Sequence, residues 1–276
     1  MKHGWLLALC SLWGAYTQAQ DAPLTILTHQ EPPFVYSNAQ GDLDGYAVQL
    51  VRGIQNEAKS PAPILLHPWA RIFYRASTEP NLLVFSMVRS AERESQFHWI
   101  TPITRNMHGL FANGPLRTDI HTLKDFAALP AIGVQRGDFR EQMMLEAGLE
   151  NIVSYTTWAQ AVGALLKGRV SALFFSSAGI NYYCMQLQQD CHFVANVYQH
   201  QIETTYLAMS RQGTSAELVD QWRSAATRYK QGQAFTMLAE YWAARYRRDY
   251  GFPLHLHNGT LNFWPAKQID REPHLP

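Results

Sequence analysis

The chain has 276 residues, of which 16% are charged and 47% are hydrophobic, and its formal net charge is +1. A charged fraction below the roughly 25% of an average soluble protein excludes a disordered polyelectrolyte. The length allows one large domain or two small ones. A chain of this length can bury a hydrophobic core that is stable without disulfides or bound metals. The near-neutral charge argues against a nucleic-acid binder, which usually shows a basic stripe, and against a polybasic membrane anchor.

The first 19 residues have the pattern of a secretory signal peptide. A basic start, Met1 to His3, is followed by the mainly apolar run Gly4 to Tyr16 and by the small-x-small site Thr17 to Ala19. This order predicts cleavage after Ala19 and export. The alternative is a membrane anchor, but the run is shorter than the ~20 residues that span a bilayer. Cleavage would remove Lys2 and leave a formal net charge of 0.

Export leaves two of the three cysteines. Cys10 departs with the signal peptide, while Cys184 and Cys191 remain as an even pair. An oxidising compartment lets such a pair close a small loop as a disulfide. Two free buried thiols are the alternative. A metal site is not expected, because the two cysteines are widely spaced and no second pair completes four ligands.

The predicted elements alternate between strands and helices along the chain. The first part contains strands at 24–28, 64–66, 82–88 and 107–112, and helices at 46–58 and 69–76. The second part contains helices at 122–129, 138–148, 157–168 and 218–229, and strands at 131–135, 152–155, 170–175, 192–197 and 205–210. Such alternation predicts an α/β fold with right-handed βαβ units and mainly parallel sheets.

The tail after Tyr250 is rich in proline, histidine and asparagine. We expect it to lie over the surface as irregular chain. The spacing of His255, His257 and His274 makes only a weak metal site. The sequence contains no zinc signature, phosphate loop or nucleophile elbow. No metal and no cofactor are therefore expected.

Four stretches, in order and spacing, carry a resemblance to a known family. They are Glu31–Phe34 with Gly41 and Leu43–Tyr46, then Pro68–Arg71, then Arg89–Glu94 with Phe97–Trp99, and finally Gly168–Val170 with Tyr206–Ser210. Together they resemble the periplasmic solute-binding proteins of the amino-acid type (family 3). The resemblance extends over roughly Leu24 to Tyr246.

This resemblance implies a two-lobed type II periplasmic-binding-protein fold with mixed, mainly parallel sheets. Lobe 1 would comprise residues 20–110 and 206–276, and lobe 2 would be the inserted segment 111–205. Two crossings, near Gly109 and Tyr206, would form the hinge. The ligand would lie in the cleft at the carboxyl ends of strands, and the lobes would close around it.

Two arginines of lobe 1 are candidates for the cleft. Arg93 lies where the family usually holds the carboxylate of the ligand, and a guanidinium offers that group a planar fork. The alternative is a surface arginine paired with Glu92 or Glu94. Arg89 follows a buried-type strand, so it would either line the cleft or tie down the loop.

Three further lobe 1 residues are ligand-binding candidates by resemblance. Trp69 matches an aromatic residue that often flanks the ligand, although ordinary packing of the helix on the sheet is the alternative. Glu31 could hold an amine, or it could be solvated at a loop tip. Phe34, after the two prolines, fits a loop anchor better than a ligand contact.

Asp138, Trp158 and Ser176 are the candidates from lobe 2. Amino-acid binders commonly place Ser or Thr after the glycine at this helix start. Here Gly137 is followed by Asp138, which would repel an anion unless it faces away as an N-cap. The family's acidic contact for an α-amine falls at Ser176, which is neutral. These departures favour a cationic amine, paired with Asp138 or Glu31, or a small polar solute as much as an α-amino acid.

Three functions compete. The first is a monomeric periplasmic receptor that binds a small amino acid, amine or organic acid for an inner-membrane ABC-type permease, without catalysis. The second is a dehydratase-like enzyme on the same fold, with Glu31 or Asp138 as the acid or base. The third is a ligand sensor that signals to a membrane partner.

Overall fold

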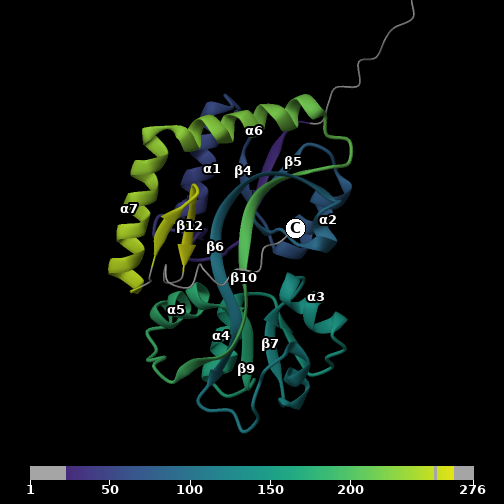
Figure 1. The fold of residues 1–276 in the computed structure, drawn as a ribbon, viewed down its shortest axis with the longest axis vertical. Helices are drawn as coiled ribbons and strands as arrows, with labels where there is room; N and C mark the ends of the chain where they lie inside the picture. Colours follow the sequence, from purple (N-terminus) through teal and green to yellow (C-terminus); the bar gives the residue numbers. More distant parts are fainter. Residues whose placement is uncertain (1–22, 252–253, 264–276) are drawn as a thin grey trace, which may run out of the picture.

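The computed structural model describes residues 23–251 and 254–263. The predicted signal peptide, Cys10 and His274 lie outside these ranges. The described chain forms two α/β bodies, one above the other, which are joined by two long strands (Figure 1). Within the same ranges, no helix combines the length and the apolar character needed to cross a membrane.

The secondary structure consists of strands and helices in close alternation. The strands are β1 (Thr25–Thr28), β2 (Tyr36–Ser37), β3 (Leu43–Asp44), β4 (Ile64–Leu66), β5 (Leu82–Val88), β6 (Phe97–Asn113), β7 (Ile132–Gln135), β8 (Ile152–Tyr155), β9 (Ala172–Ser176), β10 (Val194–Ser210), β11 (His255–His257) and β12 (Thr260–Phe263). The helices are α1 (Tyr46–Glu57), α2 (Trp69–Thr78), α3 (Phe139–Glu146), α4 (Trp158–Leu166), α5 (Ser177–Gln186), α6 (Ala216–Gln231) and α7 (Gln233–Tyr250). Two 3-10 turns span Ala91–Arg93 and Leu123–Ala128.

The upper body consists of β4, β1 and β5, which are parallel, together with α1, α2, α6 and α7. Alternate residues of the fully buried β5 face opposite sides of the sheet. Phe85 belongs to the cluster that also contains Trp222 and Trp242 from α6 and α7. Val84 belongs to the cluster that contains Trp69 from α2. The sheet is therefore covered on both faces, as a parallel sheet requires.

The lower body consists of β9, β7 and β8, which are parallel, with α3, α4 and α5 around them. Each helix begins at a residue whose side chain accepts a hydrogen bond from the first turn, and these are Asp138, Thr157 and Ser176. Such N-caps satisfy backbone donors that have no partner inside the helix. Thr157 and Gln160 form a capping box, in which each side chain bonds the backbone of the other residue.

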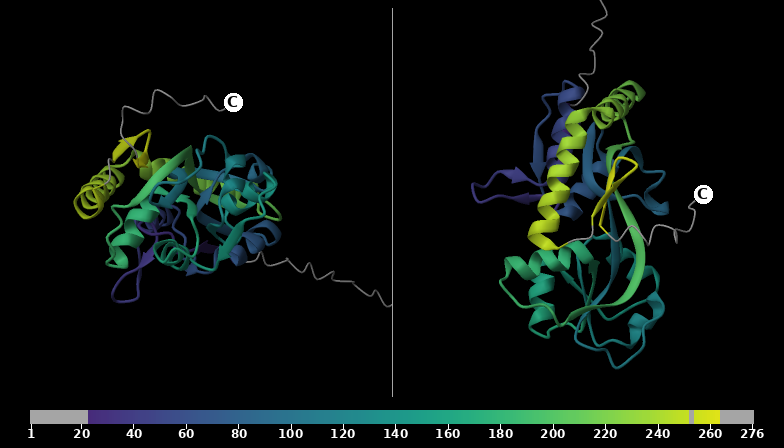
Figure 2. Two further views of the ribbon diagram at one scale, coloured as in Figure 1. Left: turned by 90° about the horizontal axis from the view of Figure 1, so that it is seen from below. Right: turned by 60° about the vertical axis from the view of Figure 1, so that its left-hand side comes forward.

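Two long antiparallel strands, β6 and β10, join the two bodies, and β10 passes between them without a break (Figure 2). In the upper body β10 pairs with β5 through Thr205–Met209, and in the lower body β6 pairs with β9 through His108–Ala112. The crossing thus lies at 105–107 and 201–204. The sequence predicted separate shorter strands at 107–112, 192–197 and 205–210; this was wrong, because mixed burial on these strands hides their continuity.

The prediction that the tail after Tyr250 is irregular chain is also wrong for the residues that the structure describes. β11 and β12 form a hairpin, and β12 pairs in parallel with β6. Asn258 and Gly259 both have positive φ at the turn, which is typical of a tight hairpin. Leu261 and Phe263 are buried against the upper body. The helix α5 was likewise not predicted.

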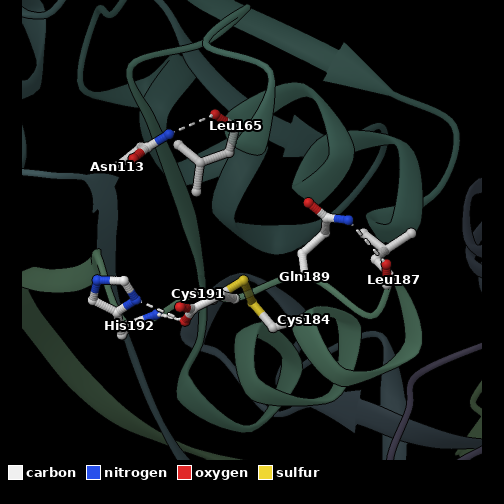
Figure 3. The surroundings of a disulfide bond; sticks show 8 residues. Asn113, Leu165, Cys184, Leu187, Gln189, Cys191 and His192 are labelled. Carbon is white, nitrogen blue, oxygen red and sulfur yellow. Dashed lines mark hydrogen bonds and ion pairs between the residues drawn. A yellow bond between two sulfur atoms is a disulfide. The ribbon is translucent and has the colours of Figure 1, made fainter.

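Cys184 and Cys191 form a disulfide, as predicted. The bond joins α5 to the segment before β10 (Figure 3). Cys184 is buried, while His192 beside the bridge is exposed and pairs with Asp190 at 2.7 Å.

Candidate functional site

The first turn of α2 in the upper body approaches the start of α3 in the lower body (Figure 1). The indole Nε1 of Trp69 donates a hydrogen bond of 2.6 Å to the carbonyl of Gly137. Gly137 has φ +73, and a Cβ added there would lie 3.1 Å from the Cβ of Ala70. The two bodies are therefore in direct contact, and the contact depends on a glycine.

Arg93 ends the 3-10 turn that follows β5, and only 7% of its surface is exposed. Its Nη1 donates to the carbonyl of Val88 at 3.4 Å. Its guanidinium lies 5.4 Å from the ring centroid of Trp69 and 4.9 Å from that of Phe73. Among the described residues, Arg93 makes no ion pair. Burial lowers its pKa, with Asp138 as the main opposing influence, but an arginine stays charged at neutral pH.

Asp138 and Arg140 form a buried ion pair at the start of α3. Oδ1 of Asp138 accepts from the backbone N of Arg140 at 2.9 Å and from its Nε at 2.7 Å, and Oδ2 accepts from Nη2 at 2.9 Å. The guanidinium lies within 5.4 Å of the centroids of three rings, Phe139, Trp158 and Phe175. Its Nη1 is buried and has no hydrogen-bond partner among the residues that the structure describes.

Arg140 was not predicted from the sequence as a site residue. A signal was present, because an arginine two residues after an aspartate N-cap can fold back onto that carboxylate. The pattern occurs on many surface helices, however, and only the three surrounding rings make it a buried feature here.

Glu31 and His29 lie on the loop after β1, with Oε2 of Glu31 3.6 Å from Nε2 of His29. Oε2 of Glu31 and Nδ1 of His29 are buried, and neither has a hydrogen-bond partner in the described part of the chain. Burial raises the pKa of Glu31 to about 8, against the opposing effect of Arg140. Burial lowers the pKa of His29 to about 4. At neutral pH both groups are therefore uncharged, and the contact is not an ion pair.

The crossing strands contribute two further buried titratable groups. Glu203 on β10 accepts a hydrogen bond from Nε2 of Gln201, and burial raises its pKa to about 7. His108 on β6 lies 5.3 Å from Phe139 between ring centroids, and burial lowers its pKa well below the usual value. Neither residue was singled out in the sequence.

A cavity lies among these groups, between the two bodies. It is lined by His29, Glu31, Trp69, Ser86, Val88, Arg93, Asp138, Phe139 and Arg140. Its free volume of about 10 Å³ leaves room for about one water molecule. The structure is thus a closed conformation, and a larger ligand requires the bodies to separate.

A larger hollow of about 490 Å³ lies in the lower body, along the loop that follows β6 and the start of β9. Arg117, which is exposed, is the one charged residue in its lining. The smaller cavity is the better candidate for a polar ligand, because its lining has buried charges and unpartnered polar atoms.

Four predicted site residues, Glu31, Trp69, Arg93 and Asp138, line the cavity, and the other four do not. Arg89 is exposed, and its guanidinium makes two hydrogen bonds, of 2.8 and 2.6 Å, to the carboxylate of Glu94.

Phe34, Trp158 and Ser176 lie inside the bodies. Phe34 packs in the upper core against Phe263, so the structure places it as the loop anchor rather than as a cleft residue. Trp158 stacks on Phe175 at 3.8 Å in the lower core. The hydroxyl of Ser176 is occupied by the backbone N of Gly179, which it caps at 3.1 Å. Hydrophobic packing and helix capping account for these three positions.

Among the described residues, no three His, Cys, Asp or Glu side chains are grouped to hold a metal ion. His255 and His257 lie on the β11 strand of the tail hairpin.

No protein-family model matches the chain. An arginine-binding periplasmic protein of Mannheimia haemolytica is 21% identical over 168 residues, which are 60% of this chain and 68% of the relative. A histidine kinase sensor domain with similarity to periplasmic binding proteins matches with a TM-score of 0.69 and 18% identity, over 79% of this chain and 95% of that domain. An ancestral arginine-binding protein bound to arginine matches with a TM-score of 0.67 and 20% identity, over 80% and 98%. The chain has the two-lobed α/β fold of type II periplasmic binding proteins, as the sequence resemblance predicted.

Proposed function

We propose that this chain is a periplasmic receptor that holds a small, carboxylate-bearing solute between its two bodies. The observation that carries the proposal is Arg93, a buried guanidinium without an ion pair in the described chain, at a cavity between two bodies in contact. Burying a charge is costly unless a partner compensates it. An anionic ligand would supply that partner.

The mechanism would be binding and closure without a covalent step. The upper body would present Arg93, while the lower body would present α3. Rotation about the crossing at 105–107 and 201–204 would open the cavity. On closure, Trp69 would reach Gly137 again and seal the ligand from water.

The proposal extends to the location of the protein and to its membrane partner. Cleavage of residues 1–19 would release a monomer into the periplasm, where its closed form would deliver the ligand to an ABC-type permease. A second reading is a sensor that signals to a membrane partner, and the likeness to a histidine kinase sensor domain supports it. Pull-down from detergent-solubilised membranes separates the two, because a permease or a signalling protein would be recovered with the ligand-loaded form.

The binding site is tested by comparing Arg93→Ala with Arg89→Ala. A thermal-shift screen over amino acids, amines and small organic acids identifies a ligand, and calorimetry then measures the affinity of each variant. We expect Arg93→Ala to weaken binding by about tenfold or more, which corresponds to the loss of a charge-assisted hydrogen bond. Arg89→Ala should bind normally, because that guanidinium is held by Glu94 outside the cavity.

The variant Arg93→Lys separates binding from folding. It keeps the charge but loses the planar fork, so we expect an intermediate affinity in a folded protein. Unchanged affinity of Arg93→Ala would overturn the proposed site.

A further inference from the structure

The charges around the cavity are unbalanced. Two guanidiniums, those of Arg93 and Arg140, line it together with the carboxylate of Asp138. Both oxygens of Asp138 already accept hydrogen bonds from Arg140. Within the described chain, the other terminal nitrogen of Arg140, Nη1, is buried and has no hydrogen-bond partner. The cavity therefore has an excess of positive charge and of hydrogen-bond donors.

Among the described residues of the lining, the one carboxylate besides Glu31 is that of Asp138, which is already paired with Arg140 rather than available to a ligand ammonium group. Glu31 keeps its proton at neutral pH, because burial raises its pKa to about 8. Glu203, which does not line the cavity, accepts a hydrogen bond from Gln201, and burial raises its pKa to about 7. An amine in this space would thus face two cations without a dedicated anion, which is unfavourable at low dielectric.

The aromatic rings around the cavity give an independent argument against a ligand ammonium group. A ligand ammonium group can also be held over aromatic rings. Trp69 and Phe73 already face the guanidinium of Arg93, at 5.4 and 4.9 Å. Phe139 already faces that of Arg140, at 4.8 Å. The protein's own cations occupy the surfaces that would suit an ammonium group.

We infer that the ligand of this site is a small carboxylate anion without an α-ammonium group, rather than an amino acid. The inference rests on the proposed function and adds the chemical class of the ligand. The carboxylate would accept from Arg93 and from the free Nη1 of Arg140. Glu31, in its protonated form, would act as a further donor.

Matched pairs of acids test the inference. Propanoate is compared with alanine, and butanoate with 2-aminobutanoate, by calorimetry at pH 7. We expect the affinity for each simple acid to be at least about tenfold higher than that for its amino counterpart. In Arg93→Ala this difference should disappear. If an amino acid binds equally well or better and binding still requires Arg93, the inference fails and the proposed function stands. If no acid of the panel shows Arg93-dependent binding, both fail.

The variant Asp138→Asn should change the binding affinity in opposite directions for the two ligand classes, simple acids and amines. Asparagine still caps α3, so the helix start is retained. Loss of the carboxylate frees Arg140, and we expect propanoate and butanoate to bind several-fold more tightly. A receptor that used Asp138 for an amine would instead lose affinity. Weaker binding of the simple acids to a folded Asp138→Asn protein would overturn the inference.

Glu31→Gln provides a second test should Asp138→Asn fail to fold. Glutamine keeps a hydrogen-bond donor in place of the protonated carboxyl, whereas leucine has none, so we expect butanoate to bind Glu31→Gln several-fold more tightly than Glu31→Leu. Calorimetry of 2-aminobutanoate in two buffers of different ionisation enthalpy should show no proton release on binding. Release of a proton by 2-aminobutanoate, together with a loss of its affinity in Glu31→Gln, would mean that Glu31 ionises to meet an amine and would contradict the inference.

Discussion

The indole Nε1 of Trp69 and the carbonyl oxygen of Gly137 are 2.6 Å apart, although 68 positions separate them in the chain. Trp69 begins α2 in the upper body, whereas Gly137 precedes α3 in the lower body. The hydrogen bond joins two bodies that are also connected by β6 and β10 and that meet again where Tyr182 of α5 packs near Tyr36 and Tyr250. It is one of the contacts of the closed state, and its loss should shift the molecule toward an open state.

Replacing Trp69 by Phe removes the donor and keeps an aromatic ring. We expect the ligand-free protein to open, because one hydrogen bond is worth about 0.5–1.5 kcal/mol, enough to shift a two-state equilibrium roughly 2- to 12-fold. Small-angle X-ray scattering should show a larger radius of gyration than that of the unaltered protein.

The matched control for this prediction is Trp242→Phe. That indole donates to Oε1 of Gln49 at 3.0 Å inside the upper body. Its loss should lower the melting temperature without changing the radius of gyration. Equal scattering curves for Trp69→Phe and the unaltered protein would contradict a closing role for Trp69.

Gly137→Ala should hinder closure by adding a methyl group at the contact with Ala70. The control is Gly114→Ala, because Gly114 has φ +88 but open space around its Cβ position. Both variants force alanine into a left-handed conformation, at a cost of about 1 kcal/mol. We expect similar losses of stability in chemical denaturation, but weaker ligand binding for Gly137→Ala alone. If both variants bind alike, the contact with Ala70 has no role in closure.

Glu31 should make the protein less stable as the pH rises from about 4.5 to about 8. The unfolded chain loses this proton near pH 4.5, while burial holds the folded pKa at about 8. Over that window the folded state binds more protons, so the free energy of unfolding falls with pH by at most about 1.4 kcal/mol per unit. Glu31→Gln should therefore be increasingly more stable than the unaltered protein as pH rises, levelling off above 8.

The difference between the two stability curves isolates Glu31 from its neighbours. Burial lowers the pKa of His29 from 6.5 to about 4, so this residue makes the free energy of unfolding rise with pH between those two values. Glu203, whose pKa is raised to about 7, acts in the same direction as Glu31. Both are present in either protein. A difference curve that stays flat from pH 5 to 8 in urea titrations would show that Glu31 is ionised in the folded state.

Removal of the disulfide should affect stability and leave ligand binding unchanged. Cys184 and Cys191 are seven positions apart, and closing so short a loop stabilises the folded state by roughly 2 kcal/mol. The double variant Cys184→Ala, Cys191→Ala should melt roughly 4–8 °C lower. Calorimetry should give the same affinity, because neither cysteine lines the cavity. A change in affinity would mean that the bridge also positions cavity residues.

Much of the fold could be predicted because its elements follow local rules. The burial pattern of α1 and the capping box at Thr157 both appear in the sequence and in the structure. The continuity of β6 and β10 could not be predicted, because these strands change partners between the bodies and their burial alternates irregularly. The β12 strand depends on an edge of β6 that local sequence does not reveal.

The site was predictable where a motif marked it and not where packing created it. Arg93 and Trp69 belong to stretches that resemble a family, and both line the cavity. Arg140 becomes buried through rings that come from three different elements, and His29 becomes neutral through burial alone. Such environments arise from tertiary contacts, so a single sequence does not show them.

The hydroxyl groups of Thr104 and Thr205 lie 2.8 Å apart, on paired positions of β6 and β10 where both strands belong to the upper body. The polypeptide therefore departs for the lower body and returns from it at adjacent points. A segment with neighbouring ends is exchangeable as a unit, because its replacement leaves the path of the remaining chain unchanged. During divergence, this architecture allows the lower body to be recombined or remodelled to alter selectivity, while the upper body retains Arg93.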